Sequence, residues 1–226
     1  MDTDAVIGKI AEIGIVPVVR LDDPDGDALP LADALCTGGV PLAEVTFRAE
    51  GAERAIAAMK AAHPEMIVGA GTVLCEEHID TALDAGADFI VTPGFDAGLV
   101  RYAIERKVPI FPGCTTATDY HAAYRMGLSV LKFFPAGLSG GVAKIKSLSA
   151  PFPMFRVMPT GGISLDNLAE YISCPVVCAC GGSYMVTPAL IGGKKWDEIS
   201  ALCRRSVEVI REARAKGAVS LRLARS

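Results

Sequence analysis

The chain has 226 residues, 51% of them hydrophobic, with a mean hydropathy of +0.37 and a formal net charge of −4. That length suits one well-buried domain, and the mild acidity argues against nucleic acid or an anionic membrane surface as a partner. The chain has no apolar run of the roughly 18 residues that a membrane helix requires, and its N-terminus is acidic where a secretory signal is basic, so we expect a cytoplasmic protein.

Short β-like runs alternate with helical segments along the whole chain. After a helix over 3–13, the predicted strands cover 15–20, 43–48, 66–70, 89–92, 109–111, 129–134, 155–158 and 176–179. Helices are predicted between and after them, at about 27–37, 51–62, 76–85, 96–106, 118–126, 141–148, 165–172 and 196–216.

Eight β-α units at even spacing predict one α/β domain over 1–226, a single (β/α)8 TIM barrel. An extra N-terminal helix (1–14) precedes the barrel in this prediction, and 218–226 forms a flexible basic tail. A doubly wound open sheet would also alternate strands and helices, but no G-x-G-x-x-G follows the first predicted strand. In a barrel, catalytic groups come from the C-terminal ends of the strands and from the loops after them.

Polar side chains alternate along the second predicted strand, A-E-V-T-F-R (43–48). Because side chains along a strand point to opposite faces with a period of two, Glu44, Thr46 and Arg48 share one face. The apolar residues between them must pack under helices, so the polar face lies in the barrel interior. Burying an acidic and a basic side chain there costs desolvation free energy, unless the two form an ion pair or bind a ligand. One interpretation is a Glu44–Arg48 ion pair that orders the core, and the other is a functional site.

The sixth predicted strand is apolar apart from Lys132, which lies near its C-terminal end. Lysine is rarely buried without a partner. An amine that is desolvated beside a second cation loses its proton more readily and becomes a nucleophile toward a carbonyl group. A lone lysine in a strand is more often ion-paired. However, Glu44, Arg48 and Thr72 are expected on the same interior surface, and this grouping favours a catalytic role for Lys132.

Two glycine turns follow the last two predicted strands. T-G-G-I-S (160–164) follows the seventh strand, and G-G-S (181–183) follows the eighth. In barrels these two loops frequently bind phosphate through backbone N–H groups and the N-terminus of a short helix, and glycine lets the anion approach the backbone closely. We therefore predict a phosphate site at these loops.

Cysteine and histidine are dispersed along the chain. The seven cysteines include no C-x-x-C motif, and the three histidines lie far apart. This pattern is typical of reduced thiols in the core of a cytosolic protein, and it predicts no metal site.

Taken together, these residues resemble a known aldolase family. The resemblance rests on seven motifs that occur in order: E-V-T-F-R (44–48), G-A-G-T-V (69–73), T-P-G (92–94), P-G (112–113), L-K-F-F-P-A (131–136), P-T-G-G-I-S (159–164) and G-G-S (181–183). They resemble the 2-keto-3-deoxy-6-phosphogluconate (KDPG) and 4-hydroxy-2-oxoglutarate (KHG) aldolase family, from about residue 15 to residue 216. K-F-F-P-A and T-G-G-I-S are the most specific of these motifs.

The resemblance implies a class I, Schiff-base aldolase. Such an enzyme reversibly cleaves KDPG to pyruvate and glyceraldehyde 3-phosphate, and some members also cleave KHG to pyruvate and glyoxylate. The family includes 6-phospho-2-dehydro-3-deoxygalactonate aldolases, and its members need no metal and usually form homotrimers. The implied partner is a small 2-oxo acid or sugar phosphate, and no cofactor is expected.

The family roles carry over to matching positions of this chain. The catalytic residues are Lys132, which matches the Schiff-base lysine, and Glu44, which matches the general acid/base. The residues expected around the pyruvyl group are Arg48 and Thr72 at its carboxylate, and Pro93 and Phe134 as apolar neighbours. The residues expected at the phosphate are Gly161, Gly162, Gly181, Gly182 and Ser183.

Several alternatives stay open. Gly137 stands where several family members carry an acid, so the sequence does not decide among gluconate, galactonate and KHG types of substrate. A phosphate-binding barrel isomerase or epimerase would share the glycine loops, but it needs no imine-forming Lys132. A non-catalytic sugar-phosphate binder would not need Glu44, Arg48 and Lys132 together. A metal-dependent pyruvate aldolase would need a ligand cluster that the sequence does not suggest.

Overall fold

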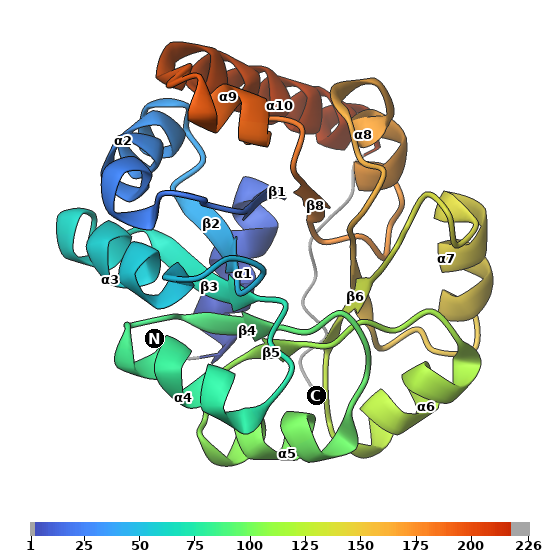
Figure 1. Ribbon diagram of the computed structural model, residues 1–226. Helices are drawn as coiled ribbons and strands as arrows, with labels where there is room; N and C mark the ends of the chain where they lie inside the picture. Colours follow the sequence, from blue (N-terminus) through green and yellow to red (C-terminus); the bar gives the residue numbers. More distant parts are fainter. Residues whose placement is uncertain (1–2, 218–226) are drawn as a thin grey trace.

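The computed structural model describes residues 3–217, in which parallel strands form a barrel surrounded by helices (Figure 1). The strands are β1 (Ile15–Val19), β2 (Leu42–Thr46), β3 (Ile67–Gly71), β4 (Phe89–Val91), β5 (Ile110–Phe111), β6 (Val130–Phe133), β7 (Arg156–Pro159) and β8 (Cys180–Gly182). The helices are α1 (Thr3–Ile13), α2 (Pro24–Thr37), α3 (Ala52–Ala62), α4 (Glu76–Asp84), α5 (Ala97–Glu105), α6 (Ala117–Arg125), α7 (Gly141–Ser149), α8 (Leu165–Ile172), α9 (Pro188–Gly192) and α10 (Trp196–Gly217).

Hydrogen-bonded ladders and single bridges close the ring of strands. Six strands form one sheet in the order β5-β4-β3-β2-β1-β8, and β6 pairs with β7 in a second sheet. The parallel bridges Gly113–Lys132 and Thr160–Gly181 join the two sheets on either side. The strand pairs are parallel, so the carboxyl ends of the strands meet at one end of the barrel. The predicted (β/α)8 barrel is confirmed.

Local sequence explains why the elements form where they do. Every residue of β2, β3 and β6 is buried, as expected of strands that face helices outside and other strands inside. Helices begin at capping residues: the Asp96 side chain accepts a hydrogen bond from the backbone of Leu99, and Thr116 accepts one from that of Asp119.

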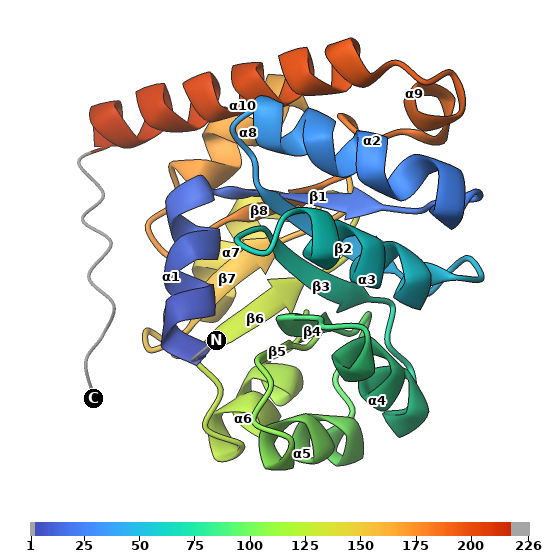
Figure 2. The same cartoon turned by 90° about the vertical axis from the view of Figure 1, so that its left-hand side faces the viewer.

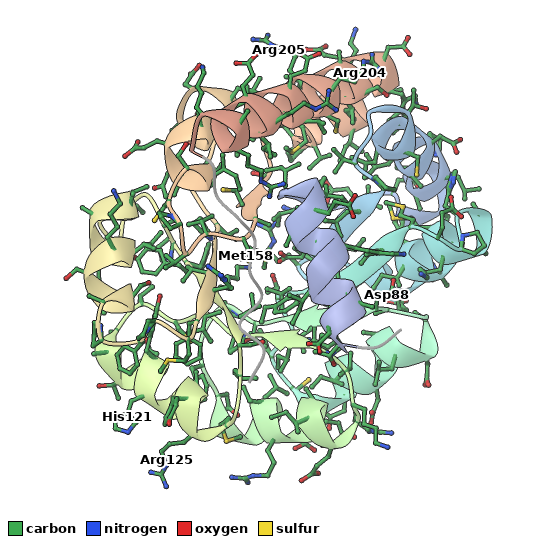
Figure 3. All side chains as sticks on the ribbon, turned by 180° about the vertical axis from the view of Figure 1, so that it is seen from behind. Asp88, His121, Arg125, Met158, Arg204 and Arg205 are labelled. Atoms are coloured by element: carbon green, nitrogen blue, oxygen red, sulfur yellow. The ribbon has the colours of Figure 1, made fainter. Side chains whose placement is uncertain are left out.

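The two ends of the barrel differ. α1 lies across the amino ends of the strands (Figure 3), where Val6, Ile7 and Ile10 are buried. Arg214 of α10 holds it there by donating to the carbonyl oxygens of Glu12 (2.8 Å) and Ala11 (2.5 Å). The strand arrows point to the other end of the barrel (Figure 2). No described helix covers that end, which faces the viewer in Figure 1.

One predicted element was wrong, and one helix was missed. The eighth strand is Cys180–Gly182 and not 176–179, because its ladder is set by β1, whose first residue Ile15 pairs with Cys180. Gly181 and Gly182 are therefore strand residues and not a turn after the strand. The five-residue helix α9 was not predicted, since one turn is too short to show a helical period. The predicted tail over 218–226 lies outside the described residues.

Candidate active site

A buried ion pair joins two strands across the barrel. Lys132 on β6 donates a hydrogen bond to Oε1 of Glu44 on β2, with an Nζ–Oε1 distance of 3.2 Å. Their side chains are only 7% and 1% exposed. Two charges removed from water to this degree require close compensation, which each gives the other.

The pair leaves polar capacity unused. Oε2 of Glu44 is buried and has no hydrogen-bond partner among the described residues. The ammonium nitrogen of Lys132 lies 5.2 Å from the ring centroid of Phe134, which offers a cation–π contact but no hydrogen-bond acceptor. A carboxylate oxygen and an amine are thus held side by side, with room for further bonding to a ligand.

A glycine makes space for the Glu44 carboxylate. Gly71 ends β3 beside β2, and a Cβ at this position would lie 2.4 Å from Oε1 of Glu44. Such a contact is not tolerated, so any other residue there would displace the carboxylate from Lys132.

Arg48 takes a different position from the one expected. β2 ends at Thr46, so Arg48 lies in the turn after the strand. Its Nε donates to Oγ1 of Thr46 (3.2 Å), whose hydroxyl in turn donates to the carbonyl of Val19 (2.7 Å). The interpretation of Glu44 and Arg48 as an ion pair was wrong, because Glu44 pairs with Lys132 and Arg48 forms no ion pair with any described residue. Its guanidinium therefore remains available to an anionic ligand.

Thr72 adopts a rare backbone conformation. Its φ is +56°, in the left-handed region that a β-branched residue seldom enters. Such conformations cost about 1–3 kcal/mol and concentrate at functional sites. Thr72 directly follows β3, so the strained residue lies at the carboxyl ends of the strands.

All eleven predicted site residues line one cavity of about 240 Å³ at this end of the barrel: Glu44, Arg48, Thr72, Pro93, Lys132, Phe134, Gly161, Gly162, Gly181, Gly182 and Ser183. Four further residues line it that had no predicted role: Val18, Thr46, Thr160 and Ile163. The lining comes from seven of the strands and the loops that follow them, whereas the individual roles stay predictions.

The glycine loops form one side of the cavity. Gly161 and Gly162 have φ values of +92° and +79°, which glycine adopts without strain. The loop leads into α8, whose first turn is capped by Ser164 and Asn167. Gly137 donates a backbone hydrogen bond to the carbonyl of Gly161 (3.0 Å), so the position that departs from the family pattern touches this loop.

Thr160 is a polar cavity residue that sequence reasoning did not assign. It is 5% exposed, and its Oγ1 has no hydrogen-bond partner in the described part of the chain. The signal was present in the sequence, since Thr160 is the first polar residue after the apolar end of β7.

Neither thiols nor other donors suggest a metal centre. The seven cysteines are free, and burial raises the pKa of the Cys178 thiol to about 11, which keeps it protonated at neutral pH. Residues 3–217 contain no group of three or more histidine, cysteine or acidic side chains placed to hold a metal ion.

The same residues contain no helix with the length and apolar character of a membrane span.

Comparisons with known proteins point to one group. Residues 6–202 match the family described as KDPG and KHG aldolase. The 2-dehydro-3-deoxy-phosphogluconate aldolase of Haemophilus influenzae is 44% identical over 209 residues, covering 92% of this chain and 98% of that protein.

Two solved structures are similar in fold and sequence. The KDPG aldolase of Legionella pneumophila, with pyruvate captured at low pH as a covalent carbinolamine intermediate, has a TM-score of 0.85 and 34% identity, covering 90% of this chain and 97% of that one. The KDPG aldolase of Zymomonas mobilis with 3-phosphoglycerate has a TM-score of 0.83 and 36% identity, covering 91% and 95% of the two chains.

Proposed function

Because this chain belongs to the KDPG and KHG aldolase family, we propose that it is a class I aldolase that cleaves KDPG to pyruvate and glyceraldehyde 3-phosphate. The observation that carries the proposal is the buried contact of 3.2 Å between Lys132 and Glu44 within the cavity. A primary amine beside a carboxylate supplies both the nucleophile and the proton-transfer group that imine chemistry requires. The shorter KHG is a second substrate in this proposal.

The reaction begins at Lys132. Once the ammonium group has given a proton to Glu44, its nitrogen attacks the C2 ketone of the substrate and forms a carbinolamine. Glu44 returns a proton to the C2 hydroxyl, which leaves as water, and a cationic imine remains. The positive nitrogen then attracts the electrons of the C3–C4 bond.

Glu44 serves the cleavage step as well. Its carboxylate accepts the proton of the C4 hydroxyl, directly or through a water, as the C3–C4 bond breaks and the aldehyde departs. The bond electrons remain on C3 as an enamine. Protonation of C3 and hydrolysis of the imine release pyruvate and restore Lys132. The unpartnered Oε2 of Glu44 supports this role, since it has capacity for the incoming hydroxyl.

The remaining cavity residues suit the two ends of the substrate. Arg48 presents a guanidinium that has no counter-ion among residues 3–217, which suits bidentate binding of the pyruvyl carboxylate, and Thr72 adds a hydroxyl. Pro93 and Phe134 form apolar walls for the pyruvyl group. The phosphate is assigned to the glycine-rich side of the cavity, with its backbone N–H groups and the Ser183 hydroxyl.

We also propose a domain organisation, a cellular location and an oligomeric state for the protein. Residues 1–226 act as one catalytic domain in the cytoplasm, where seven free cysteines remain reduced. The enzyme assembles as a homotrimer, as the resemblance to the aldolase family implies. Light scattering of the purified protein tests the trimer, and turnover that survives EDTA tests the absence of a metal requirement.

The decisive experiment traps the imine. The protein is incubated with pyruvate and borohydride, and its mass and peptide map are compared with those of Lys132→Ala. A reduced pyruvyl adduct confined to Lys132 is the expected result. If the folded protein still binds sugar phosphates but forms no adduct, the aldolase proposal is wrong, and an isomerase or a non-catalytic binder is favoured.

Substrate preference needs a separate comparison. Rates of pyruvate release from KDPG, its galactonate epimer and KHG are measured with a coupled assay. We expect KDPG to be the best of the three. A preference for the galactonate compound would instead implicate the loop at Gly137, which contacts Gly161.

A further inference from the structure

The phosphate side of the cavity contains no cationic side chain among the residues that the structure describes there. The charged residues that line the cavity are Glu44, Arg48 and Lys132, one negative and two positive. The proposed substrate carries a carboxylate and a phosphate, together about three negative charges at neutral pH. Arg48 and Lys132 both serve the pyruvyl end, so the phosphate charge is left to backbone dipoles and one hydroxyl.

Arg20 is a cation placed to correct this imbalance. β1 pairs with β8 so that Pro17 lies opposite Gly182, and the next residues on the two strands, Val18 and Ser183, both line the cavity. Arg20 lies two positions beyond Val18, directly after the strand ends. Side-chain alternation along β1, continued one residue beyond its end, assigns Arg20 to the same side as Val18, toward the rim of the cavity near Ser183.

Burial along β1 agrees with this direction. Val19 is completely buried, whereas Val18 before it is half-buried and Arg20 after it is exposed. Figure 1 shows β1 and β8 side by side at the open end of the barrel. The guanidinium therefore belongs to the residue that directly follows β1, the strand that borders the proposed phosphate site.

The present partner of Arg20 holds it only weakly. Its Nη2 lies 3.0 Å from Oδ1 of Asp22, and the two side chains are 50% and 68% exposed. Exposed ion pairs of this kind contribute little to stability, because water screens the two charges. A phosphate dianion offers more charge and a geometry that suits two guanidinium N–H groups.

We propose that Arg20 binds the phosphate group of the substrate, exchanging Asp22 for the phosphate, and so makes the enzyme selective for phosphorylated substrates. This inference rests on the proposed function, which it deepens by assigning the cation at the phosphate end. The ligand class is a phosphate monoester dianion attached to a 2-oxo acid.

The first test compares selectivity in Arg20→Ala with that in the wild type. The ratio of kcat/KM for KDPG to that for KHG should fall about 10-fold or more, because a charge-assisted hydrogen bond to phosphate is lost. Arg20→Lys should recover part of the ratio. Arg106→Ala is the matched control, since Arg106 is also a half-exposed arginine paired with an aspartate, Asp80, but lies at the other end of the barrel.

The second test needs no turnover. Inorganic phosphate is titrated into the wild type, Arg20→Ala and Arg106→Ala by calorimetry, and only Arg20→Ala should bind it about 10-fold more weakly. An unchanged selectivity ratio together with unchanged phosphate affinity would overturn the assignment of Arg20. Failure of the proposed function has a different signature, the absence of a pyruvate adduct on Lys132 in the wild type.

Discussion

The two ends of the barrel each contain a lysine paired with a carboxylate. At the closed end, Lys60 of α3 is 2.9 Å from Oδ2 of Asp88, which is labelled in Figure 3. The same ammonium donates to the carbonyl oxygens of Met66 (2.8 Å) and Pro64 (3.3 Å), and Oδ2 of Asp88 also accepts from the backbone of Val68 (3.0 Å). This pair fastens the end of α3 to β3 and to the start of β4.

At the open end, the pair of Lys132 and Glu44 is more deeply buried but less well satisfied. Lys132 makes its described hydrogen bond to Glu44 alone, and Oε2 of Glu44 makes none. A structural pair has its hydrogen-bonding capacity filled by the protein, and the pair that we assign to catalysis does not. Unfilled hydrogen-bonding capacity is therefore the feature by which we tell the catalytic pair from the structural one.

Removing each lysine should separate the two roles most sharply. Lys132→Ala should lower kcat by roughly 10³-fold or more, since no imine can form. Lys60→Ala should keep kcat and lower the free energy of unfolding by about 2 kcal/mol, because Asp88 and two carbonyls lose their shared donor. Turnover assays and urea unfolding measure both effects. If the Lys60→Ala enzyme had normal stability, the assignment of Lys60 and Asp88 as a structural pair would be wrong.

Filling the space at Gly71 should break the catalytic pair while leaving both its members in place. The methyl group of Gly71→Ala would push Glu44 away from Lys132, and kcat should fall about 10²-fold, in the range of a lost general acid/base. The control is Gly8→Ala in α1, where a Cβ meets open space and alanine favours the helix. Equal kcat in the two variants would show that the position of Glu44 is not critical.

Thr72 offers a test of strain at the open end. Thr72→Gly should raise the free energy of unfolding by about 1 kcal/mol, since glycine accepts a positive φ, and should raise KM for the substrate several-fold. Lys107→Gly is the matched control, because Lys107 has a φ of +58° outside the cavity. It should gain similar stability with KM unchanged. A gain in stability for Lys107→Gly alone would mean that Thr72 is not strained.

The smallest effect is expected at Thr160. Its buried hydroxyl lacks a protein partner, so Thr160→Val, which keeps the shape, should raise the free energy of unfolding by about 1 kcal/mol. Thermal unfolding measures the gain. A loss of stability instead would contradict the unpaired state of the hydroxyl, and a stable variant with weaker turnover would mark it as a group reserved for the ligand.

The sequence predicted the barrel because strands and helices follow from local periodicity, and that periodicity also singled out Glu44 and Lys132. The other cavity residues were predicted from the glycine turns and from the resemblance to the aldolase family. The alternation along 43–48 put Glu44 in the interior, and the apolar run around Lys132 made that lysine conspicuous. Which charges pair could not be predicted in this way. Glu44 is only four residues from Arg48, yet it bonds to Lys132, 88 residues away, because ring closure and not chain proximity decides which side chains meet.

Strand registers and turn conformations could not be predicted from the sequence either. The start of β8 depends on where β1 begins, so an apolar run over 176–179 was mistaken for the strand itself. The positive φ of Thr72 contradicts the preference of threonine, and only the surrounding structure enforces it. Arg20 carried no sequence signal, since an arginine before an aspartate-rich turn is typical of a solvated surface.

The closure of one barrel end by α1 and Arg214 has a practical consequence. α10 runs back toward that end, so α1 and the last turn of α10 lie on the side away from the cavity (Figure 2). A surface or label attached to α1 or to the last turn of α10 would therefore lie on the side away from the mouth of the barrel. Immobilised in this way, the enzyme would present its cavity to the solution, and reactor or sensor formats need no redesign of the loops around the site.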